Sequence, residues 1–172
     1  MLEVNTASSG INLQRFKDTM LKDMPYEHLN EDAAQRGLPE RNLPGMYAVF
    51  LTGMHLDQDL LTGGFVMSNP ISVDTKPEDY FHALTLNIGM SISMCIEKMK
   101  TLQPLEHDYL IGCGGGFSSP VVGQTVADLT GLKVRIFDNW REATVYGGYV
   151  LCCRATGKPV PARRQIAEIC PK

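Results

Sequence analysis

The sequence predicts a single α/β domain, and three observations favour it. Residues 77–102 repeat apolar side chains at spacings of three and four, the pattern of an amphipathic helix. Residues 105–157 alternate two strand-forming runs with two helical stretches, which is typical of an α/β unit. The 172 residues, 44% hydrophobic and 20% charged, suit one core rather than a disordered chain. We expect one domain over 1–172, with a core at about 7–157 and a tail at 158–172.

Charge and composition exclude several classes of partner. The formal charge of −3 provides no basic field for a nucleic-acid backbone, so we expect no nucleic-acid partner. No apolar run approaches the roughly 20 residues that span a bilayer, and the first residues lack a signal-peptide pattern, so we expect no membrane partner and a cytoplasmic protein. Five cysteines without a C-x-x-C pair predict reduced thiols.

The first quarter of the chain predicts one helix and one polar segment. Residues 8–24 carry apolar side chains at helical spacing and predict a surface helix. These side chains are Leu13, Phe16, Met20 and Met24. Residues 25–44 are polar and contain three prolines, so we expect a loop or an insertion there.

A short strand and a polar loop follow. Residues 46–51 form an apolar run rich in strand formers and predict a strand. The loop after it contains His55, Asp57 and Asp59, whose carboxylates suit a hard cation. A solvated loop is the simpler interpretation, and we expect no metal site.

The helix over 77–102 has the clearest pattern in the sequence. Thr75 and Glu78 have the spacing of a capping box at its start. Its apolar face, which we expect to pack against the sheet, includes Phe81, Leu84, Ile88 and Ile92. Gly89 interrupts the helix at a cost of about 1 kcal/mol relative to Ala, which suggests that another backbone packs closely there.

The second half predicts strand, helix, strand and helix. A strand at 109–111 leads into a glycine run at 112–116, and Ser118-Ser119-Pro120 opens a helix that stops at Gly131. A strand at 133–137 comes next. The last helix covers 142–155, and its Gly147-Gly148 pair suggests a second close contact.

The glycine run is the sharpest chemical feature, because a turn without side chains lets a nucleotide touch the backbone. No Gly-Lys-Ser/Thr follows, so the run is not a P-loop. Gly112 and Gly114 begin a dinucleotide fingerprint, but Phe117 stands at its third glycine position. Asp138 after the next strand keeps that hypothesis open, and a turn without a ligand is the other alternative. Ser118 and Ser119 are expected to cap the helix rather than act as nucleophiles.

Three elements resemble the carboxyl-terminal half of the FGGY carbohydrate kinases, the family of xylulose and glycerol kinases. They are Gly114–Pro120, Ala127–Gly131, and Glu142–Thr144 followed by Gly147, in the family's order and near its spacing. The resemblance covers about residues 7–157. It implies a ribonuclease H-like fold of the actin and hexokinase superfamily of ATPases, with a mixed sheet and flanking helices.

The resemblance also implies a function. In such kinases the second domain holds most of the nucleotide, and the γ-phosphoryl group of Mg-ATP passes to a hydroxyl of a sugar or polyol. By position, Gly115 and Ser119 would approach the adenine, with Gly114 on the same turn. Gly10 and Gln14 would line the opposite side of the nucleotide. ATP and Mg²⁺ are the implied cofactors.

The chain departs from the family in ways that limit this expectation. The family's amino-terminal sugar-binding domain, with its Asp-x-Gly-Thr turn and its aspartate base, has no match, and residues 55–59 lack the usual Arg-x-Pro stretch. We therefore expect no catalytic residue here, and an ATP-binding half that is inactive without its amino-terminal partner. The sequence leaves open the sugar and whether a homodimer forms. The alternatives are a non-catalytic binding or regulatory module, or a dinucleotide-binding oxidoreductase domain.

Overall fold

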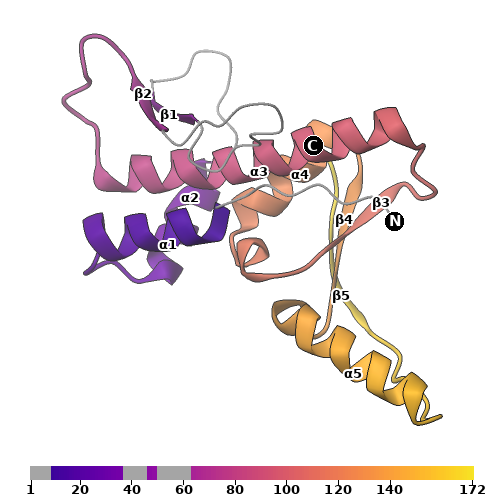
Figure 1. The fold of residues 1–172 in the computed structure, drawn as a ribbon. Helices are drawn as coiled ribbons and strands as arrows, with labels where there is room; N and C mark the ends of the chain where they lie inside the picture. Colours follow the sequence, from indigo (N-terminus) through magenta and orange to yellow (C-terminus); the bar gives the residue numbers. More distant parts are fainter. Residues whose placement is uncertain (1–8, 37–45, 50–62) are drawn as a thin grey trace.

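A single long helix, α3 (Pro77–Leu102), organises the fold. The computed structural model describes residues 9–36, 46–49 and 63–172, so the expected loop carrying His55, Asp57 and Asp59 lies outside the described residues. Figure 1 shows α1 (Ser9–Met20) and α2 (Tyr26–Arg36) along the first half of α3. The hairpin of β1 (Met46–Val49) and β2 (Gly64–Met67) lies on the other side of that half. Helix α4 (Pro120–Thr130) and a three-stranded sheet accompany the second half.

The bounds of α3 match the prediction, but its cap lies one residue later than expected. The N-cap residue is Lys76, and its backbone N–H donates to the Asp79 carboxylate at 2.7 Å. Asp79 therefore takes the place predicted for Glu78. The side chains of Phe81, Leu84 and Ile88 are buried and Ile92 is half-buried, as the periodicity predicted.

These apolar side chains do not all face one sheet. Phe81 packs against Leu21 and Leu29, between α1 and α2. Leu84 packs against Ala48 of the hairpin. Only Ile92 contributes to the core around the three-stranded sheet. The expectation that Phe81 and Leu84 pack against the sheet of the second half is therefore wrong, because α1, α2 and the hairpin cover the first half of α3.

Helix α2 corrects the prediction of a loop over 25–44. Residues 26–36 form a helix of 11 residues, while residues 37–44 lie outside the described part of the chain. Leu29 and Ala33, four residues apart, are both buried against α3 and its neighbours. These two side chains, together with the ring of Tyr26 against Phe81, anchor a helix whose other residues are mostly polar. The preceding helix α1 ends at Met20, short of the expected Met24.

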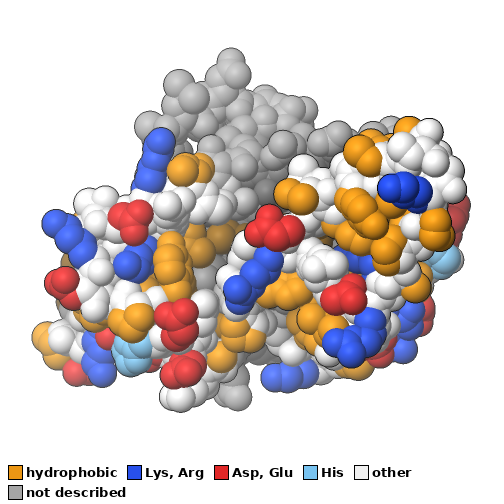
Figure 2. Space-filling model, turned by 90° about the horizontal axis from the view of Figure 1, so that it is seen from below, with side chains coloured by type: hydrophobic (Ala, Val, Ile, Leu, Met, Phe, Trp, Pro, Cys, Tyr) orange, Lys and Arg blue, Asp and Glu red, His pale blue; other side chains and the backbone are white. Residues whose placement is uncertain are grey.

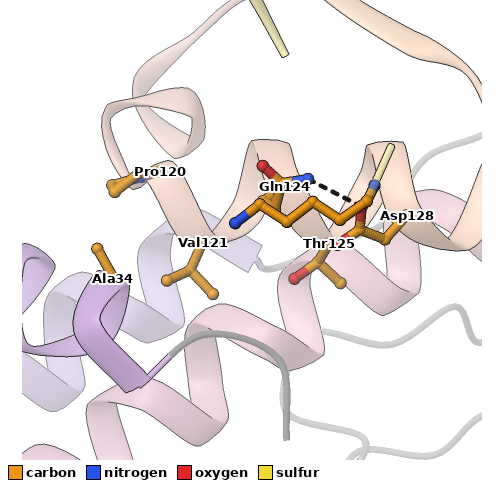
Figure 3. A pocket seen from close by; sticks show the side chains of 7 residues that line it. Ala34, Pro120, Val121, Gln124, Thr125 and Asp128 are labelled. Carbon is orange, nitrogen blue, oxygen red and sulfur yellow. Dashed lines mark hydrogen bonds between the residues drawn. The ribbon is translucent and has the colours of Figure 1, made fainter. Parts of the chain in front are cut away.

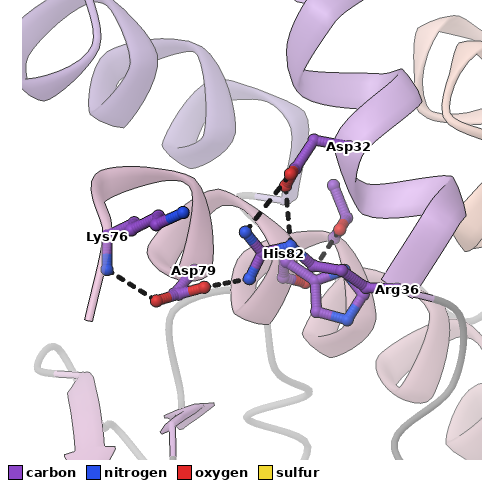
Figure 4. Close-up of polar contacts among 6 residues, drawn as sticks. Asp32, Arg36, Lys76, Asp79 and His82 are labelled. Carbon is purple, nitrogen blue, oxygen red and sulfur yellow. Dashed lines mark hydrogen bonds and ion pairs between the residues drawn. The ribbon is translucent and has the colours of Figure 1, made fainter. Parts of the chain in front are cut away.

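An arginine joins α2 to the start of α3 (Figure 4). Arg36 donates to Asp32 one turn earlier at 2.7 Å, and it also pairs with Asp79 on α3. Burial by itself lowers the pKa of Arg36. The hydrogen bonds and charges of Asp32 and Asp79 together outweigh burial, so the pKa of Arg36 is raised above its ordinary value. The Asp79 carboxylate thus both caps α3 and connects it to α2.

The main sheet contains β3 (Tyr109–Gly112), β4 (Lys133–Phe137) and β5 (Gln165–Ile169), in that order. Strand β3 runs parallel to β4, and β4 runs antiparallel to β5, so the sheet is mixed as expected. The core beside it comes from α4 and β4, with Val126, Ala127, Val134 and Ile136 buried. Residues 158–172, expected as a tail outside the core, contribute β5 to the sheet. The strand is only five residues long, and most of its side chains are exposed.

The last helix, α5 (Ala143–Ala155), confirms the predicted strand–helix–strand–helix order. In Figure 1 it extends away from the other helices. Gly147 and Gly148 have no heavy atom within 4 Å of the place where a Cβ would stand, so the predicted close contact is absent from the described residues. No helix in the described ranges is both long enough and apolar enough to cross a bilayer.

Candidate functional site at the glycine turn

The glycine run forms a tight turn between β3 and α4, and two of its glycines are required by the protein itself. A Cβ on Gly112 would lie 2.6 Å from Cδ1 of Ile136, so the end of β3 has no room for a side chain. Gly114 has φ +88° and ψ 167°, a conformation that only glycine adopts readily. Its N–H donates to the carbonyl of Trp140 at 2.8 Å, which fixes the turn to the segment after β4.

The next two glycines lie under no such constraint. Gly115 begins the short 3-10 helix η1 (Gly115–Ser118), and no heavy atom lies within 4 Å of the position of a Cβ on Gly115 or on Gly116. Neither residue has a positive φ. Packing within the described residues therefore does not require glycine at either position. The missing side chains leave exposed backbone that a ligand could approach.

Ser119 occupies the N-cap position of α4, followed by Pro120 in the first turn. The expected capping hydrogen bond is not made: the Ser119 hydroxyl is buried, and no partner for its Oγ lies among the described residues. An unpaired buried hydroxyl costs about 1–3 kcal/mol of desolvation free energy. A polar atom of a ligand at this turn would supply the missing partner.

The other two predicted residues lie on α1. Gly10 and Gln14 are both exposed, and α1 packs against α3 rather than against the turn. In the view of Figure 1 the amino-terminal end of α1 is directed toward the beginning of α4. The structure therefore brings Gly114, Gly115 and Ser119 into one turn, while no described hydrogen bond joins Gly10 or Gln14 to it.

A cavity of about 460 Å³ opens beside the turn, between α2 and α4 (Figure 3). Its lining residues are Ala34, Pro120, Val121, Gln124, Thr125, Asp128 and Lys172. None was predicted as a site residue, although Pro120 directly follows Ser119. The sequence did not reveal this cavity, because part of its wall comes from α2, expected to be a loop, and from the end of the chain, expected to be a tail.

Polar groups along one side of the cavity are already paired. Gln124 Nε2 donates to Asp128 Oδ1 at 2.8 Å, and the same oxygen accepts the backbone N–H of Lys172 at 2.7 Å. The hydroxyl of Thr125 is buried and has no partner among the described residues. The cavity thus combines an apolar wall with one unpaired hydroxyl.

Asp138, on which the dinucleotide hypothesis depended, has a structural role. Its carboxylate accepts the backbone N–H of Arg164 at 3.1 Å, and its own N–H donates to the Arg164 carbonyl at 2.9 Å. These bonds hold the segment that leads into β5. Within the described ranges, no group of three or more His, Cys, Asp or Glu side chains could hold a metal ion.

Residues 40–156 match the sequence model of the FGGY family of carbohydrate kinases, C-terminal domain. The chain therefore belongs to this family. Among curated proteins it is 28% identical over 153 residues to YoaC of Bacillus subtilis (strain 168), which is classed by name as a sugar kinase. That match covers 88% of this chain and 31% of YoaC.

Solved structures share the fold. The xylulose kinase from Rhodospirillum rubrum superposes with a TM-score of 0.65 at 16% identity, covering 95% of this chain and 33% of that kinase. The Plasmodium falciparum glycerol kinase with ADP superposes with a TM-score of 0.65 at 15% identity, covering 91% of this chain and 32% of that kinase. The chain thus spans about a third of the length of its relatives, and its fold is the actin and hexokinase-like ATPase fold that the resemblance implied.

Proposed function

We propose that this chain is the ATP-binding part of a carbohydrate kinase that transfers the γ-phosphoryl group of Mg-ATP to a hydroxyl of a sugar or polyol. Membership of the FGGY family supports the reaction class. The glycine turn carries the assignment of the nucleotide, because its backbone at Gly115 and Gly116 is open although the protein's own packing does not require glycine there. The glycerol kinase of similar fold was solved with ADP, which is consistent with this assignment.

Each residue of the candidate site has its own role in binding the nucleotide. Gly114 shapes the turn, the exposed backbone of Gly115 approaches the adenine, and the buried hydroxyl of Ser119 pairs with a polar atom of the ligand. Gly10 and Gln14 on α1 line the opposite side once the nucleotide is bound. No residue of this chain is assigned as catalytic or as a ligand of Mg²⁺.

A thermal melt with added nucleotide tests the proposal. A ligand that binds only the folded state raises the unfolding free energy by RT ln(1 + [L]/Kd), which is about 2.7 kcal/mol at a ligand concentration of about 100 Kd. We expect Mg-ATP to raise the melting temperature of the chain and NAD to leave it unchanged.

The same melt separates the two alternatives. Stabilisation by NAD but not by Mg-ATP would support a dinucleotide-binding domain. A chain that neither ligand stabilises would be a non-catalytic module with a kinase-domain fold. Titration calorimetry with Mg-ATP then gives the Kd directly and does not depend on thermal unfolding.

A further inference from the structure

Residues 163–172, which we call the β5 segment, follow the region that matches the family model, which ends at residue 156. The segment contains β5, which pairs with β4 at one edge of the sheet. Figure 1 shows β5 running beside β4. The segment contacts the protein in two places that lie close to the glycine turn along the chain: at α4, which follows the turn, and at the residues after β4.

The first contact is apolar and lies at Gly123 of α4. A Cβ on Gly123 would lie 2.5 Å from Cδ1 of Ile169 and 3.8 Å from Cδ1 of Phe117. The missing side chain of Gly123 therefore lets Ile169 lie against α4 beside Phe117, which belongs to η1 of the turn. Phe117 also lies 2.9 Å from the Cβ position on Gly112, at the end of β3. Phe117 and Ile169 thus pack in the same core, directly next to the turn.

Hydrogen bonds fasten the segment to the same helix. Gln124 Nε2 donates to the carbonyl of Cys170 at 2.9 Å, and the backbone N–H of Lys172 donates to Asp128 Oδ1 at 2.7 Å. Ile169 is therefore held from both sides, by the pairing of β5 with β4 and by these bonds to α4. Its position against Gly123 is fixed by the backbone of the segment.

The second contact is polar and lies at the residues after β4. The Asp138 carboxylate accepts the N–H of Arg164 at 3.1 Å, and the Asp138 N–H donates to the Arg164 carbonyl at 2.9 Å. Arg163 Nη2 donates to the carbonyl of Asp138 at 3.3 Å. Two residues further on, the carbonyl of Trp140 accepts the N–H of Gly114 at 2.8 Å. The segment is thus connected to the glycine that has the positive φ.

The exposed part of the turn has few contacts of its own. No heavy atom lies within 4 Å of the Cβ positions at residues 115–116, so the place of this backbone depends on the residues on either side, Gly114 and Phe117. These two are joined by a hydrogen bond from the N–H of Phe117 to the carbonyl of Gly114 at 3.1 Å. Both are connected to the β5 segment, Gly114 through Trp140 and Phe117 through Ile169.

We propose that the β5 segment positions the glycine turn for the nucleotide, and that Asp138 and Ile169 are the positioning residues. Both act through other residues rather than on the ligand. Asp138 keeps Trp140 where its carbonyl receives the N–H of Gly114, and Ile169 keeps Phe117 in place. The proposal rests on the proposed function, because it takes the turn to be the nucleotide site. A ligand that binds one form of the turn binds more weakly as that form becomes less populated, so a loosened turn raises the Kd.

Hydrogen exchange at the Gly114 amide tests the hold on the turn without any nucleotide. In Asp138→Ala this amide should exchange about three- to tenfold faster than in the parent, because the loss of one hydrogen bond makes local opening more frequent. The rate is expressed relative to amides within α3, which removes any change in global stability. Asp138→Asn should restore the parent's rate, since the side-chain oxygen of asparagine still accepts the N–H of Arg164.

Titration calorimetry with Mg-ATP measures the consequence for binding. Ile169→Val removes only Cδ1, the atom against Gly123, and should raise the Kd about two- to fivefold while the strand remains folded. Ile166→Val is the matched control, because it is the same change on the same strand at a residue that is 49% exposed. Leu151→Ala is a second control: Leu151 is 67% exposed on α5, where hydrophobic side chains gather on the surface (Figure 2). Both controls should bind Mg-ATP as the parent does.

Several results would overturn the proposal. Unchanged exchange at Gly114 in both Asp138→Ala and Ile169→Val would show that the turn holds itself. An unchanged Kd in Ile169→Val, or an equal rise in Ile166→Val, would remove the role of Ile169. A parent chain that does not bind Mg-ATP would refute the proposed function instead, and the exchange rates, measured without nucleotide, would then decide by themselves whether the β5 segment holds the turn.

Discussion

At the scale of single residues, the glycine turn contains glycines that are present for different physical reasons. Gly112 leaves room for Ile136, Gly114 supplies a positive φ, and Gly115 leaves open backbone. Substitutions at neighbouring positions should therefore have different effects on stability and on binding.

The first prediction compares alanine at two adjacent positions. Gly114→Ala should lower the unfolding free energy by about 1–3 kcal/mol, because φ +88° with ψ 167° lies in a region that side chains strain. Gly115→Ala should leave it nearly unchanged, because nothing lies within 4 Å of the new methyl group. Urea unfolding of the two variants measures both values. Similar losses at both positions would contradict the assignment of the positive φ to Gly114 alone.

The second prediction separates binding from folding at Gly115. Gly115→Val should weaken binding of Mg-ATP in titration calorimetry while the melting temperature changes little, because the branched side chain occupies the space of the ligand and not that of the protein. Gly64→Val is the matched control, since Gly64 is equally open but lies on β2. If both variants bind Mg-ATP like the parent, the nucleotide does not contact this turn.

At the scale of elements, the crossing of α3 and α4 depends on one missing side chain. A Cβ on Gly89 would lie 2.6 Å from Cβ and 2.7 Å from Cγ2 of Thr125. The close contact predicted from the sequence is therefore present, although its partner is a side chain of α4. The local cost in helix propensity at Gly89 is offset by the tight approach of the two helices.

The third prediction follows from this crossing. Gly89→Ala should gain about 1 kcal/mol of helix propensity but lose about 1–3 kcal/mol by overpacking, so the net effect is a loss of stability. Gly148→Ala in the open helix α5 should instead raise stability by up to about 1 kcal/mol. Urea midpoints of the two variants should therefore move in opposite directions. A stabilised Gly89→Ala variant would mean that α3 and α4 separate easily.

The fourth prediction concerns pH and the pairing of β4 with β5. The hydrogen bond from Arg135, at 2.8 Å, is the main cause that lowers the pKa of Glu168. The charged carboxylate thus stabilises the fold at and above the ordinary glutamate pKa of about 4.3, and this contribution is lost as the pH falls through the lower pKa of the folded state.

Thermal melts over a range of pH check this sign. Glu168→Gln should melt below the parent at pH 7, and the two curves should converge below about pH 4, where the parent carboxylate also becomes protonated. Glu106→Gln, on an exposed connection outside the sheet, should show no such pattern. A difference that persists unchanged in acid would assign the effect to packing rather than to charge.

At the scale of the whole molecule, the proposed function makes the chain one side of a two-domain reaction. Phosphoryl transfer needs a positioned hydroxyl, a metal-bound triphosphate and a group that orients the attack. The described residues offer an open glycine turn and a neighbouring cavity, but no group of acidic, histidine or cysteine side chains that could hold a metal.

The fifth prediction is that the chain alone shows no sugar-dependent turnover of ATP. A panel of pentuloses, hexuloses and glycerol, assayed for release of ADP, should give background rates because closure of two domains brings nucleotide and hydroxyl together. Addition of an amino-terminal kinase half should restore turnover. A substantial rate from the chain alone, lost in Asp57→Asn, would assign the chemistry to the loop at residues 55–59.

Local patterns of the sequence were sufficient for the elements whose apolar residues repeat strongly. The helix at 77–102, the strand at 133–137 and the turn before α4 could all be predicted, because each is determined by interactions between residues close in the chain. The family could be recognised for a related reason: its motifs lie in the turn, in the end of α4 and in the start of α5. The hypothesis of a nucleotide at the glycine turn also came from residue types alone, and it stays a prediction.

Tertiary structure decided the features that depend on distant partners. Helix α2 carries few apolar side chains and strand β5 is only five residues long. They are stabilised by Phe81, by the Arg36 ion pairs and by pairing with β4, none of which adjacent residues reveal. The cavity exists because α2 and the end of the chain both meet α4. The exposure of α5 is likewise a property of the whole molecule. Its apolar composition was determined by the sequence alone, but only the arrangement of the other elements leaves most of its side chains exposed.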